Sequence, residues 1–371
     1  MDKKILSNNS REEEKVYWVA FSNFEGIGPA RFKLLADYFG GAKKAWMASY
    51  LELEKIGLNQ KLVADFCTFR EKFLPYDYSN SLKEKAIGVL TLFDEGYPEL
   101  LKQISSAPPV LYFKGEIKKE DNLALAVVGT RKITVYGRAV TELLVSQLVG
   151  AGLTIVSGMA RGVDTAAHQA ALSAGGRTIA ILGSGIDVIY PPENKGLYEA
   201  IAKNGAVVSE FPVGYPALPQ NFPARNRIIS GFSLGVLVTE AAQDSGSLIT
   251  ASDAAEQGRE VFAVPGPITS PMSAGTSELI QKGAKLVHSV QDILDELNLK
   301  QRSAQLLARE IVAENPEEEK IIATLRNGPS HIDEIIKQTK LETATVGSLL
   351  GLMEIKGKVK NLGGGEYGLM R

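Results

Sequence analysis

The stretch "LALAVVG" at residues 123–129 is a continuous apolar run, without the alternation of polar and apolar side chains that marks a half-exposed strand. Such a run is typical of a strand that is covered on both faces, as in a parallel sheet. Similar runs follow along the chain. They are "LTIVSG" (153–158), "RTIAILGSG" (177–185), "AVVSE" (206–210), "GVLVTE" (235–240), "EVFAVPG" (260–266) and "AKLVH" (284–288).

Helical patterns separate these runs, beginning with "VYGRAVTELLVSQLVGAG" and continuing at 163–174, near 195–203, from about 247 and near 276–282. Strand alternating with helix implies right-handed crossovers and a parallel sheet with helices on both faces. We therefore predict an α/β fold, a Rossmann-like doubly wound domain over residues 81–297. In such sheets ligands bind at the carboxyl ends of the strands.

The flanking regions differ in composition from this central domain. Residues 1–15 are charged and are predicted to be a mobile tail, and residues 298–316 a charged linker. Residues 16–80 show helical periodicity, and Gly26-Ile27-Gly28 joins two helical patterns there. This arrangement resembles a helix-hairpin-helix (SAM-like) domain, whose hairpin N–H groups can meet a DNA phosphate. A plain helical packing module is the alternative.

The last region, residues 317–371, has the order of a winged helix: three helical patterns followed by a Gly-rich hairpin. The third helix of such a domain is where a DNA reader carries basic or amide side chains. Here that segment, "TATVGSLLGLMEI" (343–355), contains no basic residue. Contact with DNA and contact with a protein both remain open for this domain.

Bulk properties exclude several classes of protein. The net charge is −2, so a site for a polyanion must be local, and the one cysteine excludes an internal disulfide framework. There is no signal peptide or membrane-length apolar run, which predicts a cytoplasmic protein. The three histidines show no metal-ligand spacing, so we expect no metal and no catalytic constellation. No cofactor is expected either, because Gly183-Ser184-Gly185 lacks the third glycine of a dinucleotide fingerprint, having Val188 there.

Candidate binding residues gather near the predicted strand ends. The stretch "NFPARNRIISG" (221–231), read as a loop, places an aromatic beside two arginines. Aromatic faces stack on unpaired bases, and arginines suit phosphate oxygens. The cationic and aromatic candidates are Arg131, Arg161, Phe222, Arg225 and Arg227. The alternatives are a Phe222 that packs onto the domain and arginines in salt bridges, for example Arg227 with Glu210 or Glu240.

Small-residue turns that enter helices are further candidates. Ser157-Gly158 and Ser245-Gly246-Ser247 follow predicted strands, and helix N-termini offer unpaired N–H groups to phosphate. Ordinary helix capping explains any single turn equally well. Several such turns at one sheet edge, with arginines beside them, favour a phosphate site.

Together these segments resemble the DNA-processing protein A family (DprA, also called Smf). The resemblance covers about residues 93–290 and includes "EGYPELLKQISSAPPVLYFKG", "VVGTR", "VSGMARGVDTAAHQAAL", "AILGSGIDVIYP", "NFPARNRIISG" and "SGSLITASDAAEQGREVFAVPG". It implies a non-enzymatic protein that binds and protects incoming single-stranded DNA in natural transformation and loads the RecA recombinase. It also implies a homodimer.

Carried over onto this chain, the resemblance implies DNA contacts at the turn Gly129-Thr130-Arg131, base stacking by Phe222 and a place for Arg225 in the same segment. One departure is Ser277, where the family usually has Asn. The rival function is a nucleotide phosphoribohydrolase, suggested by the Gly/Pro turn that starts at Pro265, although its glycine spacing differs. A nucleotide-sensing scaffold is a third alternative.

Overall fold

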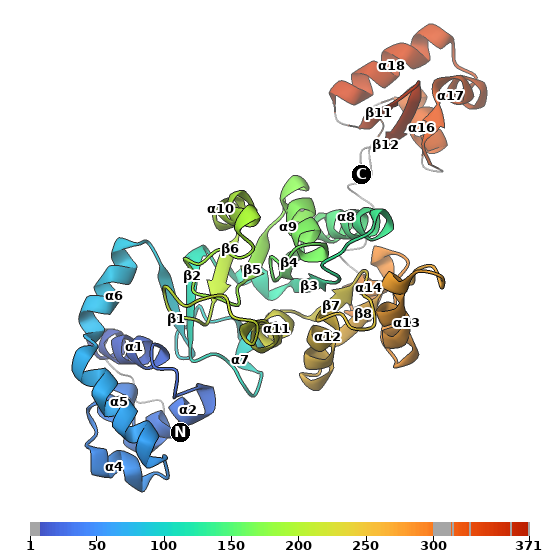
Figure 1. Cartoon of the computed structure of the whole chain (residues 1–371). Coiled ribbons are helices and arrows are strands. Elements are labelled where there is room, and N and C mark those ends of the chain that lie inside the picture. The colour runs from blue at the N-terminus through green and yellow to red at the C-terminus, as the bar shows by residue number, and fades with distance from the viewer. Residues whose placement is uncertain (1–7, 300–312, 314, 326–327, 357, 370–371) are drawn as a thin grey trace. The chain divides into compact units, whose positions relative to one another are not determined.

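The computed structural model describes residues 8–299, 313, 315–325, 328–356 and 358–369. These residues form two compact units, divided between Leu299 and Lys300. The boundary predicted near residue 80 falls within the first unit, and most of the predicted linker lies outside the described residues. Figure 1 shows the helices and strands of each unit.

The first unit is built on a nine-stranded sheet in the order β1-β2-β6-β5-β4-β3-β7-β8-β9. Seven of its strands are parallel, and they confirm the predicted doubly wound fold. Their bounds are β3 (Ala124–Val128), β4 (Thr154–Ser157), β5 (Thr178–Ile181), β6 (Ala206–Ser209), β7 (Gly235–Val238), β8 (Glu260–Ala263) and β9 (Lys285–Leu286). The direction of strand order reverses between β3 and β7, so this is the switch point of the sheet.

Two antiparallel strands extend the sheet at one edge. β1 (Gly88–Thr91) pairs with β2 (Val110–Gly115), and β2 pairs in turn with β6. The sequence patterns above did not predict these strands. Between them lies the short helix α7 (Glu99–Lys102).

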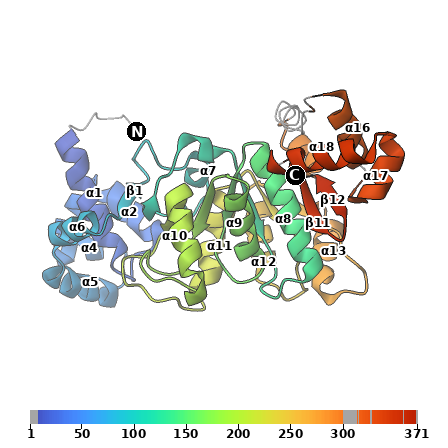
Figure 2. The ribbon, with the colours of Figure 1, turned by 90° about the horizontal axis from the view of Figure 1, so that it is seen from above.

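Helices cover both faces of the sheet, as Figures 1 and 2 show. One face carries α8 (Val135–Gly150), α9 (Val163–Ser173) and α10 (Lys195–Asn204). The other carries α11 (Asn221–Gly231) and α12 (Ser247–Glu256), and the chain of this unit ends with α13 (Ala274–Gln281) and α14 (Val290–Glu296). Strands β3–β7 are fully buried, which explains why their sequences are uniformly apolar.

The N-terminal region is helical, as predicted. Its helices are α1 (Asn8–Ser22), α2 (Pro29–Phe39), α3 (Ala42–Met47), α4 (Tyr50–Lys55), α5 (Gln60–Lys72) and α6 (Pro75–Glu84). Residues 8–15, which the sequence analysis assigned to a mobile tail, belong to α1. The Glu14 carboxylate accepts a hydrogen bond of 2.6 Å from the Ala42 N–H at the start of α3, and this contact ties that part of α1 to the region. Phe21, Trp46 and Phe66 form the aromatic centre of its core.

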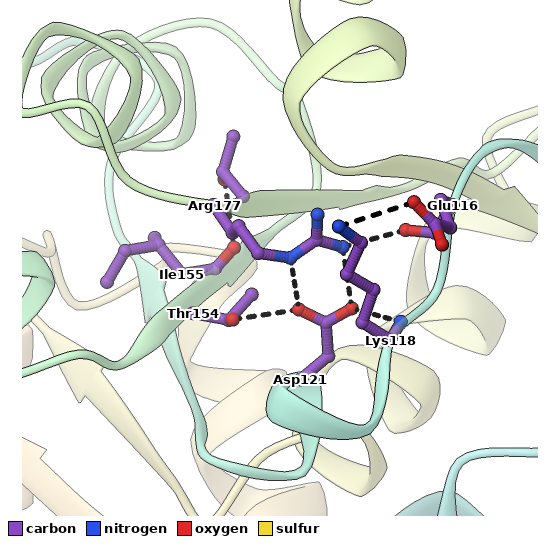
Figure 3. Close-up of polar contacts among 7 residues, drawn as sticks. Glu116, Lys118, Asp121, Thr154, Ile155 and Arg177 are labelled. Atoms are coloured by element: carbon purple, nitrogen blue, oxygen red, sulfur yellow. Dashed lines mark hydrogen bonds and ion pairs between the residues drawn. The ribbon is translucent and has the colours of Figure 1, made fainter.

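A buried ionic network closes the amino edge of the sheet (Figure 3). The Asp121 carboxylate accepts two hydrogen bonds of 2.9 Å from the Arg177 guanidinium, one of 2.8 Å from the Thr154 hydroxyl and one of 2.8 Å from the Lys118 N–H. Arg177 also donates to the Glu116 carbonyl at 2.7 Å. The network joins the start of β4, the start of β5 and the connection from β2 to β3.

The second unit contains α16 (Pro316–Leu325), α17 (Ile332–Thr339) and α18 (Thr343–Ile355), with a three-stranded sheet of β10 (Ser330–His331), β11 (Val359–Gly363) and β12 (Glu366–Leu369). This is the predicted winged helix. Its core is apolar and includes Ile322, Ile335 and Leu350.

Candidate nucleic-acid interface at the carboxyl edge

The stretch 221–231 is a helix, α11, and its prediction as a loop was wrong. Pro223 is the third residue of this helix. In the first turn of a helix the backbone N–H groups have no intrahelical partner, so a proline there removes no hydrogen bond. The proline therefore marks the start of a helix here, and it does not break one.

The helix separates the side chains that the sequence had grouped. Phe222 and Arg225 are three residues apart and share one face of α11, whereas Arg227 is two residues further and points away from that face. The Arg227 guanidinium pairs with the Glu210 carboxylate at 2.6 Å, and both side chains are largely buried. The alternative of a salt bridge is the one that the structure shows for Arg227.

Phe222 and Arg225 line a shallow depression at the carboxyl ends of β3, β4 and β5. Its lining is Arg131, Gly158, Ala160, Arg161, Tyr190, Pro191, Phe222 and Arg225. The Arg131 guanidinium lies over the Phe222 ring, 5.5 Å from its centroid, and the centroid of the Tyr190 ring lies 5.5 Å from that of Phe222. The structure thus brings Arg131 of the first βα turn and Phe222 of α11 together, as the prediction of a common site required.

Arg131 and Arg161 are the exposed cations of this depression. Among the described residues, Arg131 forms no ion pair, whereas the Arg161 Nε donates to the Glu193 carboxylate at 2.5 Å. That pair is more than half exposed on both sides, so water and salt screen it. A phosphate could therefore compete with Glu193 for Arg161.

Arg225 is buried beneath the depression, with only 4% of its surface exposed. Its guanidinium donates to the Gly158 carbonyl at 2.8 Å and to the Ile181 carbonyl, at the ends of β4 and β5. Burial lowers the pKa of Arg225 to about 10, and the nearby Asp164 carboxylate opposes that shift. Arg225 stays charged at neutral pH, so it holds two strand ends together and places a positive charge under the depression.

The turn at Ser157-Gly158 is occupied by protein groups. The Asp164 carboxylate accepts hydrogen bonds from the Gly158 N–H at 3.1 Å and the Ala160 N–H at 3.3 Å. The Ser157 hydroxyl is fully buried and donates to the Val127 carbonyl at 2.6 Å. Burial raises the pKa of Asp164, and Arg225 opposes that effect. The amide that we expected to bind phosphate is bonded to a carboxylate of the protein.

A second carboxylate occupies the switch point. Glu240 follows β7 and is 2% exposed. Its side chain accepts hydrogen bonds from the Thr134 N–H at 2.9 Å and the Thr134 hydroxyl at 2.6 Å, where α8 begins. The Glu240 carbonyl accepts from the Thr130 N–H at 2.7 Å, which fixes the turn Gly129-Thr130-Arg131. Dinucleotide-binding proteins of this fold place a pyrophosphate at this helix terminus, and here the Glu240 side chain fills the position.

The turn at Ser245-Gly246-Ser247 begins α12, and it lies next to α11. The Gly246 carbonyl accepts from the Asn226 amide at 3.3 Å, and the hydroxyls of Ser245 and Ser247 are 2.8 Å apart. Gly246 is exposed. The turn borders α11 one residue after Arg225, and it is not part of the lining of the depression.

Tyr190 is a member of the site that sequence reasoning did not select. It is 40% exposed and follows the strand end "GSGID" by a few residues. The signal that could have found it is an aromatic residue just before two prolines, in a connection that leaves the carboxyl edge. No helix among the described residues could cross a membrane, and none of their His, Cys, Asp and Glu side chains cluster as a metal site.

Comparison with known proteins places this architecture in a family. Residues 88–298 match the family model of DNA recombination-mediator protein A, and residues 301–365 match the DprA winged helix domain. The chain is 35% identical to protein Smf of Synechocystis, over 95% of this chain and 98% of that one. It is 45% identical to DNA processing protein DprA of Streptococcus pneumoniae, over 62% of this chain and 81% of that one.

Two solved structures of DprA proteins are similar to this chain. The crystal structure of DprA from Streptococcus pneumoniae superposes with a TM-score of 0.67 at 37% identity, over 76% of this chain and 97% of that one. DNA processing protein A from Helicobacter pylori, solved to describe its single-stranded DNA binding mode, gives a TM-score of 0.52 at 31% identity, over 58% of this chain and 96% of that one. With the family model covering more than half of the sequence, the chain belongs to the DprA/Smf family, whose central domain is that of DNA recombination-mediator protein A.

Proposed function

We propose that this protein binds single-stranded DNA at the carboxyl edge of its sheet, protects strands that enter the cytoplasm during natural transformation and loads RecA onto them. The observation that carries the proposal is the group of Arg131, Phe222 and Tyr190, in which an exposed guanidinium lies over one of two neighbouring aromatic rings. Stacking surfaces interleaved with cations are what single-strand binders use.

The geometry suggests how a strand would engage. The contact of Arg131 with the Phe222 ring is worth about 0.5–1 kcal/mol at an exposed site. Stacking of a base on an aromatic side chain is worth about 1–3 kcal/mol. A base can therefore replace the guanidinium on the ring, and the released Arg131 is then free to bind the adjacent phosphate.

The rival hydrolase finds little support in this site. A drug-sized ligand requires a pocket of roughly 300–1,000 Å³, whereas the depression encloses about 20 Å³, of the order of one water molecule. Glu240 and Asp164 moreover occupy the turns that would hold a nucleotide phosphate. An open surface with cations suits a polymer that passes over it better than a nucleotide that must be enclosed.

The role in loading RecA and the homodimer rest on the family resemblance. The winged helix agrees with a protein-contact role, because α18 is the helix that would face DNA bases and carries no basic side chain. We assign the principal DNA contacts to the first unit and contact with proteins to the second.

The test is a comparison of labelled single-stranded and duplex DNA of equal length, by fluorescence anisotropy at several salt concentrations. Single strands should bind more tightly, with little sequence preference, because a duplex hides the faces of its bases. Equal affinity for both forms at every salt concentration would reject the proposal. Incubation with nucleoside monophosphates, followed by chromatography for released base, tests the rival hydrolase.

A further inference from the structure

A second group of exposed side chains lies at the same edge of the sheet, beyond the depression. Val135 and Tyr136 begin α8 and are 89% and 41% exposed, and Ile268, in the connection after β8, is 99% exposed. We call these three residues the α8 platform. Large apolar side chains this exposed are unusual when they cluster, and clusters of this kind mark binding surfaces.

The ring of Tyr136 is held in place. Its hydroxyl donates a hydrogen bond of 2.6 Å to the Pro265 carbonyl, in the connection that carries Ile268 three residues later. A tyrosine fixed at its hydroxyl end leaves the ring as a rigid surface, which loses little conformational entropy when a ligand stacks on it.

The α8 platform continues the candidate DNA interface. The chain runs from Arg131, which contacts Phe222, through the exposed Lys132 to Tyr136, and five residues of chain span at most about 17 Å. The connection that bears Ile268 also returns to this turn, since the Thr130 hydroxyl lies 3.8 Å from the Met272 sulfur. Two aromatic positions thus flank the cations Arg131 and Lys132 on one edge.

We propose that the α8 platform is a second base-binding subsite, and that a single strand extends from Phe222 across Arg131 and Lys132 to Tyr136 and Ile268. This inference rests on the proposed function. The Glu240 carboxyl group beneath the subsite is bonded to Thr134 and is 2% exposed, so a bound strand would not touch it. A stable protein interface buries roughly 800 Å² per partner, more than three side chains supply, and this favours DNA over a second protein.

The first experiment measures affinity against strand length, with oligothymidylates of about 4 and about 16 nucleotides, the range of site sizes seen in single-strand binders. Tyr136→Ala should weaken binding of the long strand by about 5- to 150-fold, the loss expected for one stacked base, and leave the short strand unaffected. Tyr136→Phe, which keeps the ring, should retain most of the affinity. An unchanged affinity of Tyr136→Ala for the long strand, with Arg131→Ala still impaired, would overturn the subsite and leave the proposed function standing.

The second experiment uses Ile268, whose near-complete exposure means that substitution does not disturb folding. Ile268→Lys should tighten binding of the long strand and Ile268→Glu should weaken it, because only the sign of the added charge differs. If both variants leave DNA affinity unchanged and both lower self-association in analytical ultracentrifugation, the α8 platform is a protein interface and the inference is wrong. If the parent protein binds no single strand at all, the proposed function itself fails.

Discussion

Both edges of the parallel sheet carry an arginine, but the arginine at one edge is bonded to a carboxylate, whereas the arginine at the other edge is bonded to no carboxylate of the described residues. At the amino edge, both oxygens of the Asp121 carboxylate are hydrogen-bonded, and Arg177 is committed to that carboxylate and to a carbonyl. At the carboxyl edge, Arg131 is exposed and lies over an aromatic ring. The same residue type stabilises the fold at one edge and remains available to a ligand at the other.

The position of an arginine therefore matters less than the contacts that its guanidinium already makes. Arg225 and Arg227 lie on α11, the helix that carries Phe222, and would pass as binding residues by type alone. Their guanidinium groups donate to backbone carbonyls and to Glu210 respectively. If this difference holds, arginines that are paired with protein groups and arginines that are exposed should respond differently to substitution.

The largest effect is expected at the amino edge. Asp121→Ala should lower the free energy of unfolding by about 3–5 kcal/mol, because removing one partner of a buried pair leaves the other uncompensated. The affinity of the folded variant for single-stranded DNA should not change. Urea denaturation measures the first quantity and anisotropy the second. The control is Glu116→Ala, which removes the exposed pair with Lys118 and should cost at most about 1 kcal/mol. Equal losses for the two variants would contradict the contrast between the edges.

Between the edges, His168 tests the cost of a buried group that has only one partner. Its Nδ1 lies 2.7 Å from the Thr178 hydroxyl, while Nε2 has no hydrogen bond among the described residues. Burial, assisted by the charge of Arg225, lowers the pKa of His168 to about 3.

The folded protein therefore keeps His168 neutral where the unfolded chain, with a pKa of about 6.5, binds a proton. Stability should fall as the pH drops below about 6.5, by up to about 1.4 kcal/mol per pH unit. Urea midpoints between pH 7 and pH 5 measure this slope, and His168→Gln should flatten it. A His168→Gln variant with the parent slope would show that other groups cause the pH dependence.

At the carboxyl edge, Phe222→Ala should lose about 1–3 kcal/mol of affinity for single-stranded DNA, with little change in the salt dependence. Because Phe222 is half-buried against Gly183 and Tyr190, the melting temperature should also fall. Phe222→Trp should retain most of the affinity. Phe222→Leu should regain part of the stability without the affinity, since it restores packing without an aromatic face. Recovery of both by Leu would mean that Phe222 only packs.

Arg131→Ala should reduce the slope of log affinity against log salt by about 0.7, the value for one phosphate contact on a single strand. The melting temperature should hardly change, since the side chain is exposed. Arg227→Ala is the matched control: it should lower the melting temperature and leave the salt slope as it was. If instead Arg131→Ala lowers the melting temperature and Arg227→Ala reduces the salt slope, then Arg227 is the DNA-binding arginine and Arg131 is structural.

The smallest effect is expected from deletion of residues 317–371, which should leave most of the single-strand affinity intact, because α18 offers no cation to phosphate. The truncated protein is measured beside the full chain under the same salt conditions. Near-complete loss of binding in a folded truncation would make the winged helix a principal DNA site and would end the assignment of binding to the sheet edge.

The sequence was most informative where one physical cause dominates. Burial on both faces makes β3 to β7 uniformly apolar, so these strands could be predicted. The antiparallel strands β1 and β2 were not predicted. β1 is half-exposed and β2 changes from buried to exposed along its length, so neither has a uniformly apolar sequence. The helix α11 was missed because Pro223 was taken as a loop signal, although proline fits the first turn of a helix.

Side-chain partners were the least predictable part of the candidate site. Because residues 221–231 form a helix, Arg225 points under the depression and Arg227 points toward Glu210. A segment interpreted as a loop has no fixed periodicity, so these directions could not be predicted from the sequence. The side chains of Asp164 and Glu240 accept hydrogen bonds from backbone N–H groups of the turns. From the sequence alone, these N–H groups could only be counted as free to bind a phosphate. The cluster of Arg131 with Phe222, in contrast, followed from the rule that ligands meet the carboxyl ends of parallel strands.

The carboxylate of Glu240 has a consequence for how this protein would behave in a cell crowded with small metabolites. ATP, NAD and their relatives carry phosphate groups that other proteins of this architecture capture at the N-terminus of the first crossover helix. The Glu240 side chain already accepts the hydrogen bond of the Thr134 N–H at that point, so this donor is withheld from those groups. Under the proposed function, small nucleotides would therefore compete poorly with a DNA strand, which would bind at several points of this edge at once.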